Sequence, residues 1–190
     1  MRHISRNWEK THSNAIVLKA LLRKETEFAL TLSGRCMDPL LIEGDMAKIV
    51  PTSKFTIGHL YLFVLPSGAL SVHRMIGKTG EGAVMKGDRS RGDETIQYKN
   101  IIGVVSELKI IGDEGWYITG NYRWIGTVFA ILSKITVVKD GYPCGTNTEN
   151  LHTPMQKVCA LALIALSHIT RWFWLNSFSS RRNNKQLNQP

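Results

Sequence analysis

Cysteine is scarce in this chain, and its few cysteines do not form a recognisable framework. The 190 residues contain Cys36, Cys144 and Cys159, an odd number without the regular spacing of a disulfide-stapled secreted domain. We therefore expect Cys36 to be a free thiol. The sequence also contains no CxxC or HxxxH pair, so it predicts no structural zinc site, and we expect no metal and no other cofactor.

Acidic residues are also few: 15 Asp and Glu stand against 24 Lys and Arg, which gives a formal net charge of +9. Part of this excess lies in polar flanks, around Arg2 and Lys10 at one end and Arg181 to Lys185 at the other. Such flanks are either solvated or bound to an anionic membrane surface, and both interpretations stay open. Because no basic stripe interleaved with aromatics is present, we do not expect nucleic acid as a partner.

A long uninterrupted apolar run is missing as well. The most apolar stretch near the N-terminus, 15–22, contains Lys19, so the sequence predicts no N-terminal signal peptide. The stretch 158–175 is apolar only as far as 166 and then includes His168 and Arg171. It has three possible roles: to cross a membrane, to lie in the membrane interface, or to pack on the protein. The expected location is therefore membrane-associated or cytoplasmic.

What the chain does contain is a series of short strands. Hydrophobic content of 43% suffices for a core, and hydrophobicity alternates with a period of two from Phe28 to Ser33. Before this strand, Ser13 or Asn14 caps an amphipathic helix that runs to about Glu27. Further strands, separated by Gly and Pro turns, are predicted at 46–50, 59–65, 69–76, 83–86 and 100–111. The fold class predicted is mainly β, with a barrel-like core, an N-terminal amphipathic helix and a C-terminal helix.

The composition changes after Gly112. Aromatic residues lead into 125–138, whose pattern fits a helix or a strand, and a loop follows. Thr153 and Gln156 form a capping box around Pro154, which predicts a helix from 154 onward. The predicted organisation begins with a basic segment and amphipathic helix at 1–27 and a β domain at 28–112. An aromatic and apolar extension with a loop follows at 113–150. An apolar helix at 151–176, a candidate for membrane association, and a disordered basic tail at 177–190 end the chain.

The stretch with most chemical content is 33–45, SGRCMDPLLIEGD, which presents Cys36 where a strand ends. His73 lies on a later strand, and an imidazole near a thiol favours the nucleophilic thiolate and can return a proton to a leaving amine. A carboxylate that orients the imidazole would complete a triad, and Asp88, Asp93 and Glu94 follow the next predicted strand.

Five segments in order resemble the superfamily of type I signal peptidases and LexA-like self-cleaving peptidases. They are GRCMDPLLIEGD (34–45), GHLYLFVLP (58–66), VHRMI (72–76), KGDRSRGDE (86–94) and IIGVVSEL (101–108). The family pattern is G-x-S-M-x-P-x-L-x-x-G-D, followed by a base on a strand and a K-G-D box with a later acid. The V-H-R context is most similar to the archaeal and endoplasmic-reticulum branch, whose base is histidine. The resemblance covers about 28–110.

The resemblance implies roles for individual residues. Cys36 falls on the nucleophile and His73 on the general base, while Asp93 is preferred as the third acid, with Glu94 a close rival. Gly34, Arg35 and Met37 are expected beside the substrate. The remaining residues are expected to support the site: Pro39, Gly44, Asp45, Arg74, Gly87 and Asp88. The role of Asp88 is either structural or catalytic. Arg74 either braces an acid or faces solvent.

The sequence departs from the family in two ways. It has Cys36 where the family has serine, and Gly34 where signal peptidases often have a serine that assists the oxyanion hole, so backbone N–H groups would have to serve instead. The function predicted is a signal-peptidase-like endopeptidase acting on a leader or signal segment, with a peptide or precursor protein as partner and a membrane surface as a candidate partner. The alternative is an inactive peptide-binding module. A self-cleaving regulator is disfavoured because the base is not lysine.

Overall fold

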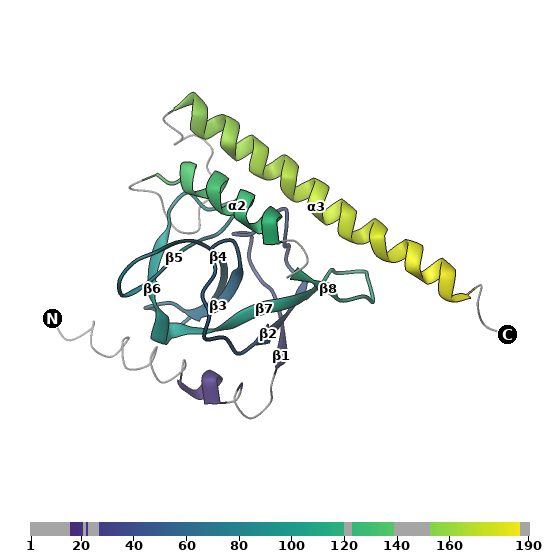
Figure 1. Cartoon of the computed structure of the whole chain (residues 1–190), viewed down its shortest axis with the longest axis horizontal. Coiled ribbons are helices and arrows are strands. Elements are labelled where there is room, and N and C mark those ends of the chain that lie inside the picture. Colours follow the sequence, from purple (N-terminus) through teal and green to yellow (C-terminus); the bar gives the residue numbers. More distant parts are fainter. Residues whose placement is uncertain (1–15, 21, 23–26, 120–122, 139–152, 187–190) are drawn as a thin grey trace.

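The structure is a computed structural model that describes residues 16–20, 22, 27–119, 123–138 and 153–186. Its centre is an antiparallel sheet with the strand order β1-β2-β7-β3-β4-β5-β6 (Figure 1). A further short strand, β8, pairs with β7. The strands are β1 Phe28–Thr31, β2 Met46–Val50, β3 Leu60–Val64, β4 Leu70–Lys78, β5 Gly82–Lys86, β6 Glu94–Gln97, β7 Ile101–Lys109 and β8 Tyr117–Ile118.

The predicted mainly β class is confirmed, whereas the barrel is not shown. In the observed order β1 and β6 are the two edges, so the sheet is open. The strands predicted from alternation correspond to β1 to β5 and β7, with ends that differ by one or two residues at most positions. Two short strands, β6 and β8, were not predicted because a polar stretch of four residues and a stretch of two residues leave no periodic signal.

The central strand β3 explains how one sheet supports two hydrophobic clusters. All five of its residues are buried, and successive side chains point to opposite faces. Leu60, Leu62 and Val64 join the larger cluster, which also receives residues of the helices. Tyr61 and Phe63 join the smaller cluster against β5 and β6. The continuous apolar run LYLFV is what a strand covered on both faces requires.

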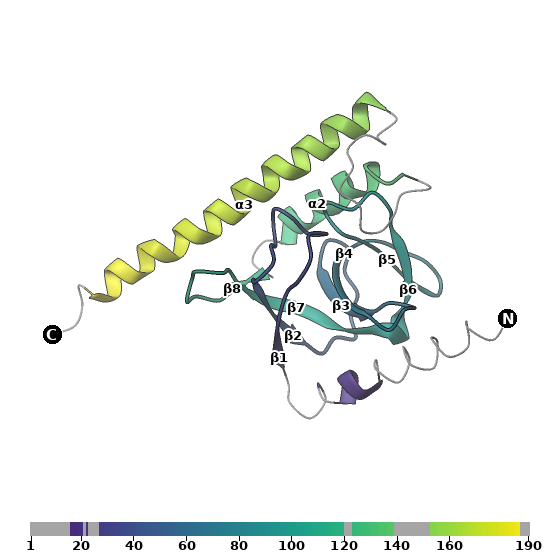
Figure 2. The same cartoon turned by 180° about the vertical axis from the view of Figure 1, so that it is seen from behind.

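Two helices, α2 (Arg123–Ile135) and α3 (Pro154–Gln186), lie together on one side of the sheet, and the short helical turn at 16–20 lies on the opposite side (Figures 1 and 2). For 125–138 the structure selects the helical alternative. The predicted capping box is present, since Gln156 N donates to Thr153 Oγ1 and Thr153 N donates to Gln156 Oε1. Residues 177–186, which belong to the predicted disordered tail, continue α3 in the structure, and 187–190 lie outside the described residues.

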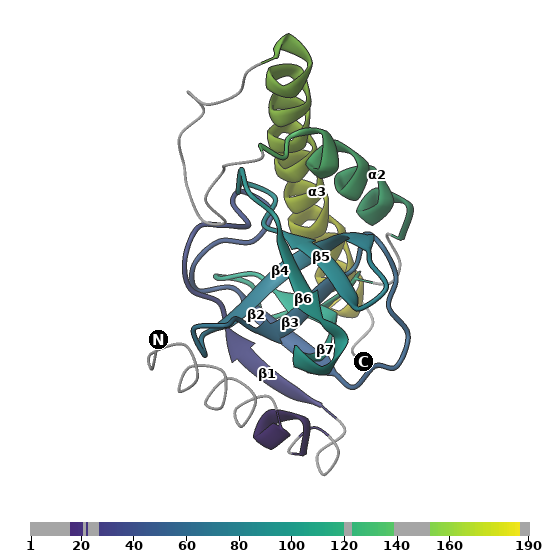
Figure 3. The ribbon, with the colours of Figure 1, turned by 90° about the vertical axis from the view of Figure 1, so that its left-hand side faces the viewer.

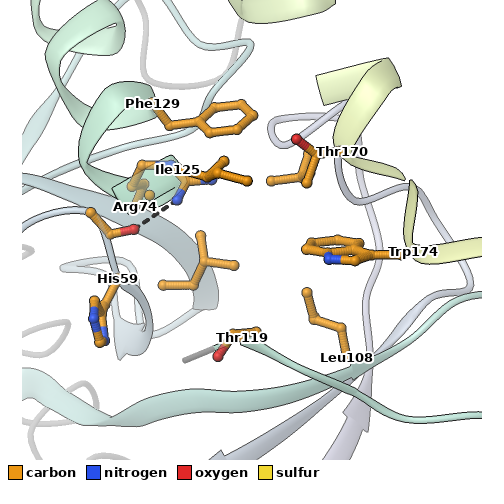
Figure 4. Close-up of a pocket in the computed structure, with 12 residues that line it drawn as sticks. His59, Arg74, Leu108, Thr119, Ile125, Phe129, Thr170 and Trp174 are labelled. Carbon is orange, nitrogen blue, oxygen red and sulfur yellow. Dashed lines mark hydrogen bonds between the residues drawn. The ribbon is translucent and has the colours of Figure 1, made fainter. Parts of the chain in front are cut away.

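Helix α2 closely approaches the loop before β3. Gly58 has φ +93°, and a Cβ there would lie 2.6 Å from the backbone of Gly126 in α2, so only glycine permits this approach. Beside it lies a small cavity of about 50 Å³ (Figure 4). Arg74 and Phe129 face it from β4 and α2, and Trp174 faces it from α3 (Figure 4). At this point α2 packs against β4, the strand that carries His73, and Figure 3 shows the two helices beside the sheet.

The helix α3 is fixed to the loop before β2 by Arg171. Its Nη1 and Nη2 donate to the two carboxylate oxygens of Asp45 at 2.5 and 3.0 Å, and Nη1 also donates to the carbonyl of Leu40. Asp45 is fully buried, and its oxygens also accept the backbone N–H groups of Ile42 and Ile111. These four donors offset much of the free-energy cost of burying the carboxylate.

We expect Arg171→Met to lower the free energy of unfolding by about 3 kcal/mol, because it leaves the buried Asp45 charge without its cation. Chemical denaturation measures this loss. Lys157→Met, at an exposed position of the same helix, is the matched control and should change stability by no more than about 0.5 kcal/mol. Equal, small effects of the two substitutions would contradict the role assigned to Arg171.

Candidate active site

Cys36 and His73 line one cavity of about 300 Å³. Its walls come from the end of β1 and the following loop on one side, and from β3 and the first half of β4 on the other. The lining residues are Leu30 to Gly34, Cys36, Met37, Leu41, Ile42, Leu62 and Leu70 to His73. The predicted nucleophile and base are therefore brought to one place, although 37 positions separate them in the sequence.

His73 is buried and is oriented by an acid. Its Nδ1 lies 2.7 Å from Oε1 of Glu94, and the side chains of the two residues are 5% and 13% exposed. The ring also contacts Phe63 edge-on, with centroids 5.7 Å apart. An ionised carboxylate only accepts hydrogen bonds, so it holds the ring in the tautomer with a proton on Nδ1 and a lone pair on Nε2. This is the orientation a general base needs.

The acid that contacts His73 in this structure is Glu94, the rival, and not the preferred Asp93. Glu94 is the first residue of β6 and pairs with Met85 of β5, which pairs in turn with Met75 of β4, two positions beyond His73. Asp93 precedes the strand, and its side chain is exposed. Since consecutive side chains of a strand point to opposite faces, only knowledge of β6 distinguishes these neighbours.

A residue that the sequence analysis did not assign to the site, Ser71, lies on the other side of the imidazole. Its Oγ is 3.3 Å from Nε2 of His73. Both residues belong to β4 and are two positions apart, so they point to the same face of the sheet. That spacing was the available signal: alternation places Ser71 beside His73, but the family pattern carries no serine there.

Cys36 is disulfide-bonded, so the prediction of a free thiol is wrong. Its partner lies outside the described residues, and Cys159, buried in α3, is free. A sulfur in a disulfide has no thiolate form and cannot attack a carbonyl until a thiol reductant releases it. An odd number of cysteines does not determine which of them stays unpaired, so the sequence alone could not show that Cys36 forms a disulfide.

The two loops that frame the site are bound to each other and to β4. Arg89 N donates to the carbonyl of Cys36 at 2.9 Å, and a Cβ on Gly87 would lie 2.6 Å from that same oxygen. Arg74 Nε and Nη2 donate to the two oxygens of Asp88 at 2.9 and 2.7 Å, with both side chains buried. Arg74 thus braces an acid rather than facing solvent, and Asp88 supports the loop without contacting His73 in any hydrogen bond among the described residues.

The remaining predicted residues occupy the first loop. Gly34 and Met37 line the cavity, as expected for residues beside a substrate. Arg35 instead points outward, 68% exposed, and pairs with Asp38. Gly44 has φ +92°, Pro39 follows a cis peptide bond, and Asp45 is the buried acceptor of Arg171, so these three residues shape the loop. The supporting roles predicted for Gly44 and Asp45 are consistent with these contacts.

Lys86 is buried in β5 next to this framework, and burial lowers its pKa to about 8. The neighbouring carboxylates of Asp88 and Asp93 oppose the shift but do not cancel it. Its Nζ donates to the carbonyl of Gly87 at 3.3 Å. Within the described part of the chain, no group of three or more His, Cys, Asp or Glu side chains is arranged to hold a metal ion.

Comparison of the chain with protein-family models, with curated proteins and with solved structures returns no match.

The depressed pKa of Lys86 predicts how Lys86→Met affects stability. A folded pKa of about 8 against an ordinary 10.5 means that the unfolded chain binds more protons on this group between those values, so its contribution to stability rises with pH across that window. Below pH 8 the buried charge is a constant penalty. We expect Lys86→Met to stabilise the protein by about 1–3 kcal/mol at pH 7.

The difference between Lys86→Met and the wild-type protein should shrink as pH rises from about 8 toward 10.5. Urea denaturation of both proteins at several pH values measures it. A Met variant that is less stable at pH 7 would mean that the hydrogen bond to Gly87 outweighs the desolvation of the charge.

Proposed function

We propose that this protein is a signal-peptidase-like endopeptidase that hydrolyses a peptide bond in an extended leader or signal segment. The observation that carries the proposal is the His73–Glu94 pair, 2.7 Å apart and directed at the cavity that Cys36 also lines. The order and spacing of the five sequence segments described above support the same function. A barrel-like arrangement of the core, as in that superfamily, belongs to this proposal.

The backbone around the cavity suits an extended peptide. In the described sheet β1 pairs only with β2, so its other edge faces outward. The first half of β4, Leu70 to His73, pairs with β3, while β5 pairs with β4 only from Arg74 onward. The cavity is lined by both of these strand edges. An extended segment placed there would add a strand through main-chain hydrogen bonds, and the apolar walls would select its side chains.

In the proposed reaction His73 acts as general base and then as general acid. The nucleophile loses its proton to Nε2 and attacks the scissile carbonyl carbon, and the resulting oxyanion is stabilised by backbone N–H groups of the Cys36 loop. The imidazolium then gives that proton to the departing amine. Water, activated by the same imidazole, hydrolyses the acyl-enzyme. Cys36 occupies the family's nucleophile position and serves in this role once a thiol reductant has opened its disulfide.

One observation favours the alternative of a peptide-binding module without turnover. The disulfide at Cys36 removes the nucleophile that the family pattern provides, yet it leaves the cavity and the strand edges in place. Such a module would present a leader segment to a partner. It predicts binding of precursor peptides without any product.

The test of the peptidase is cleavage of leader-bearing precursors, followed by mass spectrometry, with and without a dithiol reductant. We expect product from the wild-type protein, none above background from His73→Ala, and a rate about 10²–10⁴-fold lower for Glu94→Gln, which leaves the imidazole in the wrong tautomer. His168→Ala, at an exposed histidine of α3, is the matched control. Binding without product in either redox state would favour the module instead.

We also propose that the outer face of α2 and α3 binds an anionic membrane surface. Large apolar side chains are exposed along it, including Val158, Leu161 and Ile169 of α3 and Trp124 and Ile131 of α2. The two helices contain no acidic residue, and their basic residues are Arg123, Lys134, Lys157, Arg171, Arg181, Arg182 and Lys185. Lys134 and Lys157 are exposed on these helices, and exposed cations together with exposed apolar side chains fit a bilayer that contains acidic lipids.

The stretch Pro154–Leu175 is long and apolar enough to cross a bilayer. Contacts to the sheet favour a helix that lies in the interface. Every third or fourth residue, from Cys159 through Leu163 and Ser167 to Trp174, is buried against the protein, and Arg171 is bound to Asp45. Crossing the membrane would break these contacts and place Arg171 in hydrocarbon. An interfacial position keeps them and still buries the outer face.

Sedimentation with lipid vesicles tests this surface. We expect binding to vesicles that contain phosphatidylserine and weaker binding to vesicles of phosphatidylcholine alone. The double substitution Leu161→Glu and Ile169→Glu should lower the affinity at least about tenfold, since it removes two apolar side chains from the interface. Val17→Glu, at an exposed position of the helical turn on the far side of the sheet, is the control (Figure 1). Equal binding by all three proteins would contradict the proposal.

A further inference from the structure

A hydroxyl, an imidazole and a carboxylate stand in series in the cavity. Ser71 Oγ lies 3.3 Å from His73 Nε2, and His73 Nδ1 lies 2.7 Å from Glu94 Oε1. These are the contacts of a Ser-His-acid triad, in which the acid orients the base and the base receives the proton of the hydroxyl. Ser71 and His73 lie on β4 and Glu94 lies on β6, with β5 between these two strands.

The direction of each hydrogen bond follows from the chemistry of the groups. The Glu94 carboxylate accepts the Nδ1 proton, which leaves Nε2 as an acceptor. The Ser71 hydroxyl is then the donor to Nε2, the same bond that activates a nucleophilic serine. The His73 side chain is only 5% exposed, so water competes little for the lone pair on Nε2.

Ser71 is also placed where a substrate would lie. It is half-buried and lines the cavity of about 300 Å³, on the part of β4 that β5 leaves open. Cys36 lines the same cavity, but its sulfur is held in a disulfide. In the oxidised protein the hydroxyl of Ser71 is therefore the group bonded to the base.

We propose that Ser71 is a second nucleophile of this site and serves His73 when Cys36 is oxidised. The inference rests on the proposed peptidase function for its substrate. Ser71 Oγ would form a bond to the scissile carbonyl carbon as its proton passes to His73 Nε2. Collapse of the tetrahedral intermediate breaks the C–N bond, the amine leaves with that proton, and water hydrolyses the acyl-serine ester.

A serine that only steadies the imidazole would make the same hydrogen bond, so the test must detect covalent reactivity. The full chain, purified without reductant, is incubated with a fluorophosphonate probe, which reacts with activated serine hydroxyls. Peptide mapping by mass spectrometry then locates the adduct. Ser33 provides a matched comparison, because it also lines the cavity but is exposed and lies on the opposite wall.

We expect the adduct on Ser71, its loss by at least about a hundredfold in His73→Ala, and its retention in His168→Ala, at the exposed histidine of α3. Ser71→Ala should lose the adduct and keep the melting temperature of the wild-type protein, which excludes unfolding as the cause. An adduct on Ser33 instead, or no adduct on Ser71 in a folded protein, would overturn the proposal, as would labelling of Ser71 that His73→Ala leaves unchanged.

The result also separates this inference from the peptidase function. If Ser71 is labelled through His73 but no precursor is cleaved, the inference holds and the proposed peptidase fails. If the reduced protein cleaves precursors, Cys36→Ala abolishes that cleavage and Ser71 takes no probe, the peptidase holds and the inference fails.

Discussion

The arrangement of the site depends on the buried ion pair between Arg74 and Asp88. Taking both charges out of water is unfavourable unless their hydrogen-bonding groups are satisfied. Here the Arg74 guanidinium donates to both Asp88 oxygens and to the carbonyl of Gly58. Its Cζ lies 4.5 Å from the centroid of the Phe129 ring. Because Arg74 follows His73 directly in β4, fixing Arg74 on one face of the sheet fixes the imidazole on the other.

A second charged pair holds the opposite wall in the same manner. Arg171 of α3 and the backbone N–H groups of Ile42 and Ile111 satisfy the fully buried Asp45. The two clamped loops then meet where Arg89 N donates to the carbonyl of Cys36. Two acidic residues in Gly-Asp turns are thus each bound by an arginine of another element, Asp88 by Arg74 of β4 and Asp45 by Arg171 of α3.

Much of this architecture could be predicted from local patterns. Alternation located β1 to β5 and β7, and Thr153 with Gln156 located the start of α3. The pairing of His73 with an acid was also predicted, but the choice between Asp93 and Glu94 required the register of β6, a strand too short and polar to be recognised. The disulfide at Cys36 could not be predicted, because pairing between distant cysteines depends on tertiary structure and not on spacing.

The family resemblance directed attention to Cys36 and away from Ser71. A family motif assigns roles only to the positions that it specifies, and it gives no information about a side chain at a position where the family varies. The hydrogen bond between Ser71 and His73 is visible only once β4 and β6 are assembled, since Glu94 fixes which nitrogen of the ring accepts. The structure therefore defines the His73–Glu94 pair more firmly than it defines the group that would act as nucleophile.

The two proposed nucleophiles would place unequal demands on that base. A thiol has a pKa of about 8.5, so a useful fraction ionises near neutral pH with modest help from the imidazole. A serine hydroxyl has no such fraction and must lose its proton as it attacks, so it needs an imidazole held in the correct tautomer. Loss of Glu94 should consequently impair reaction through Ser71 more than reaction through reduced Cys36. On this chemistry the redox state of Cys36 would determine how strongly turnover depends on the acid.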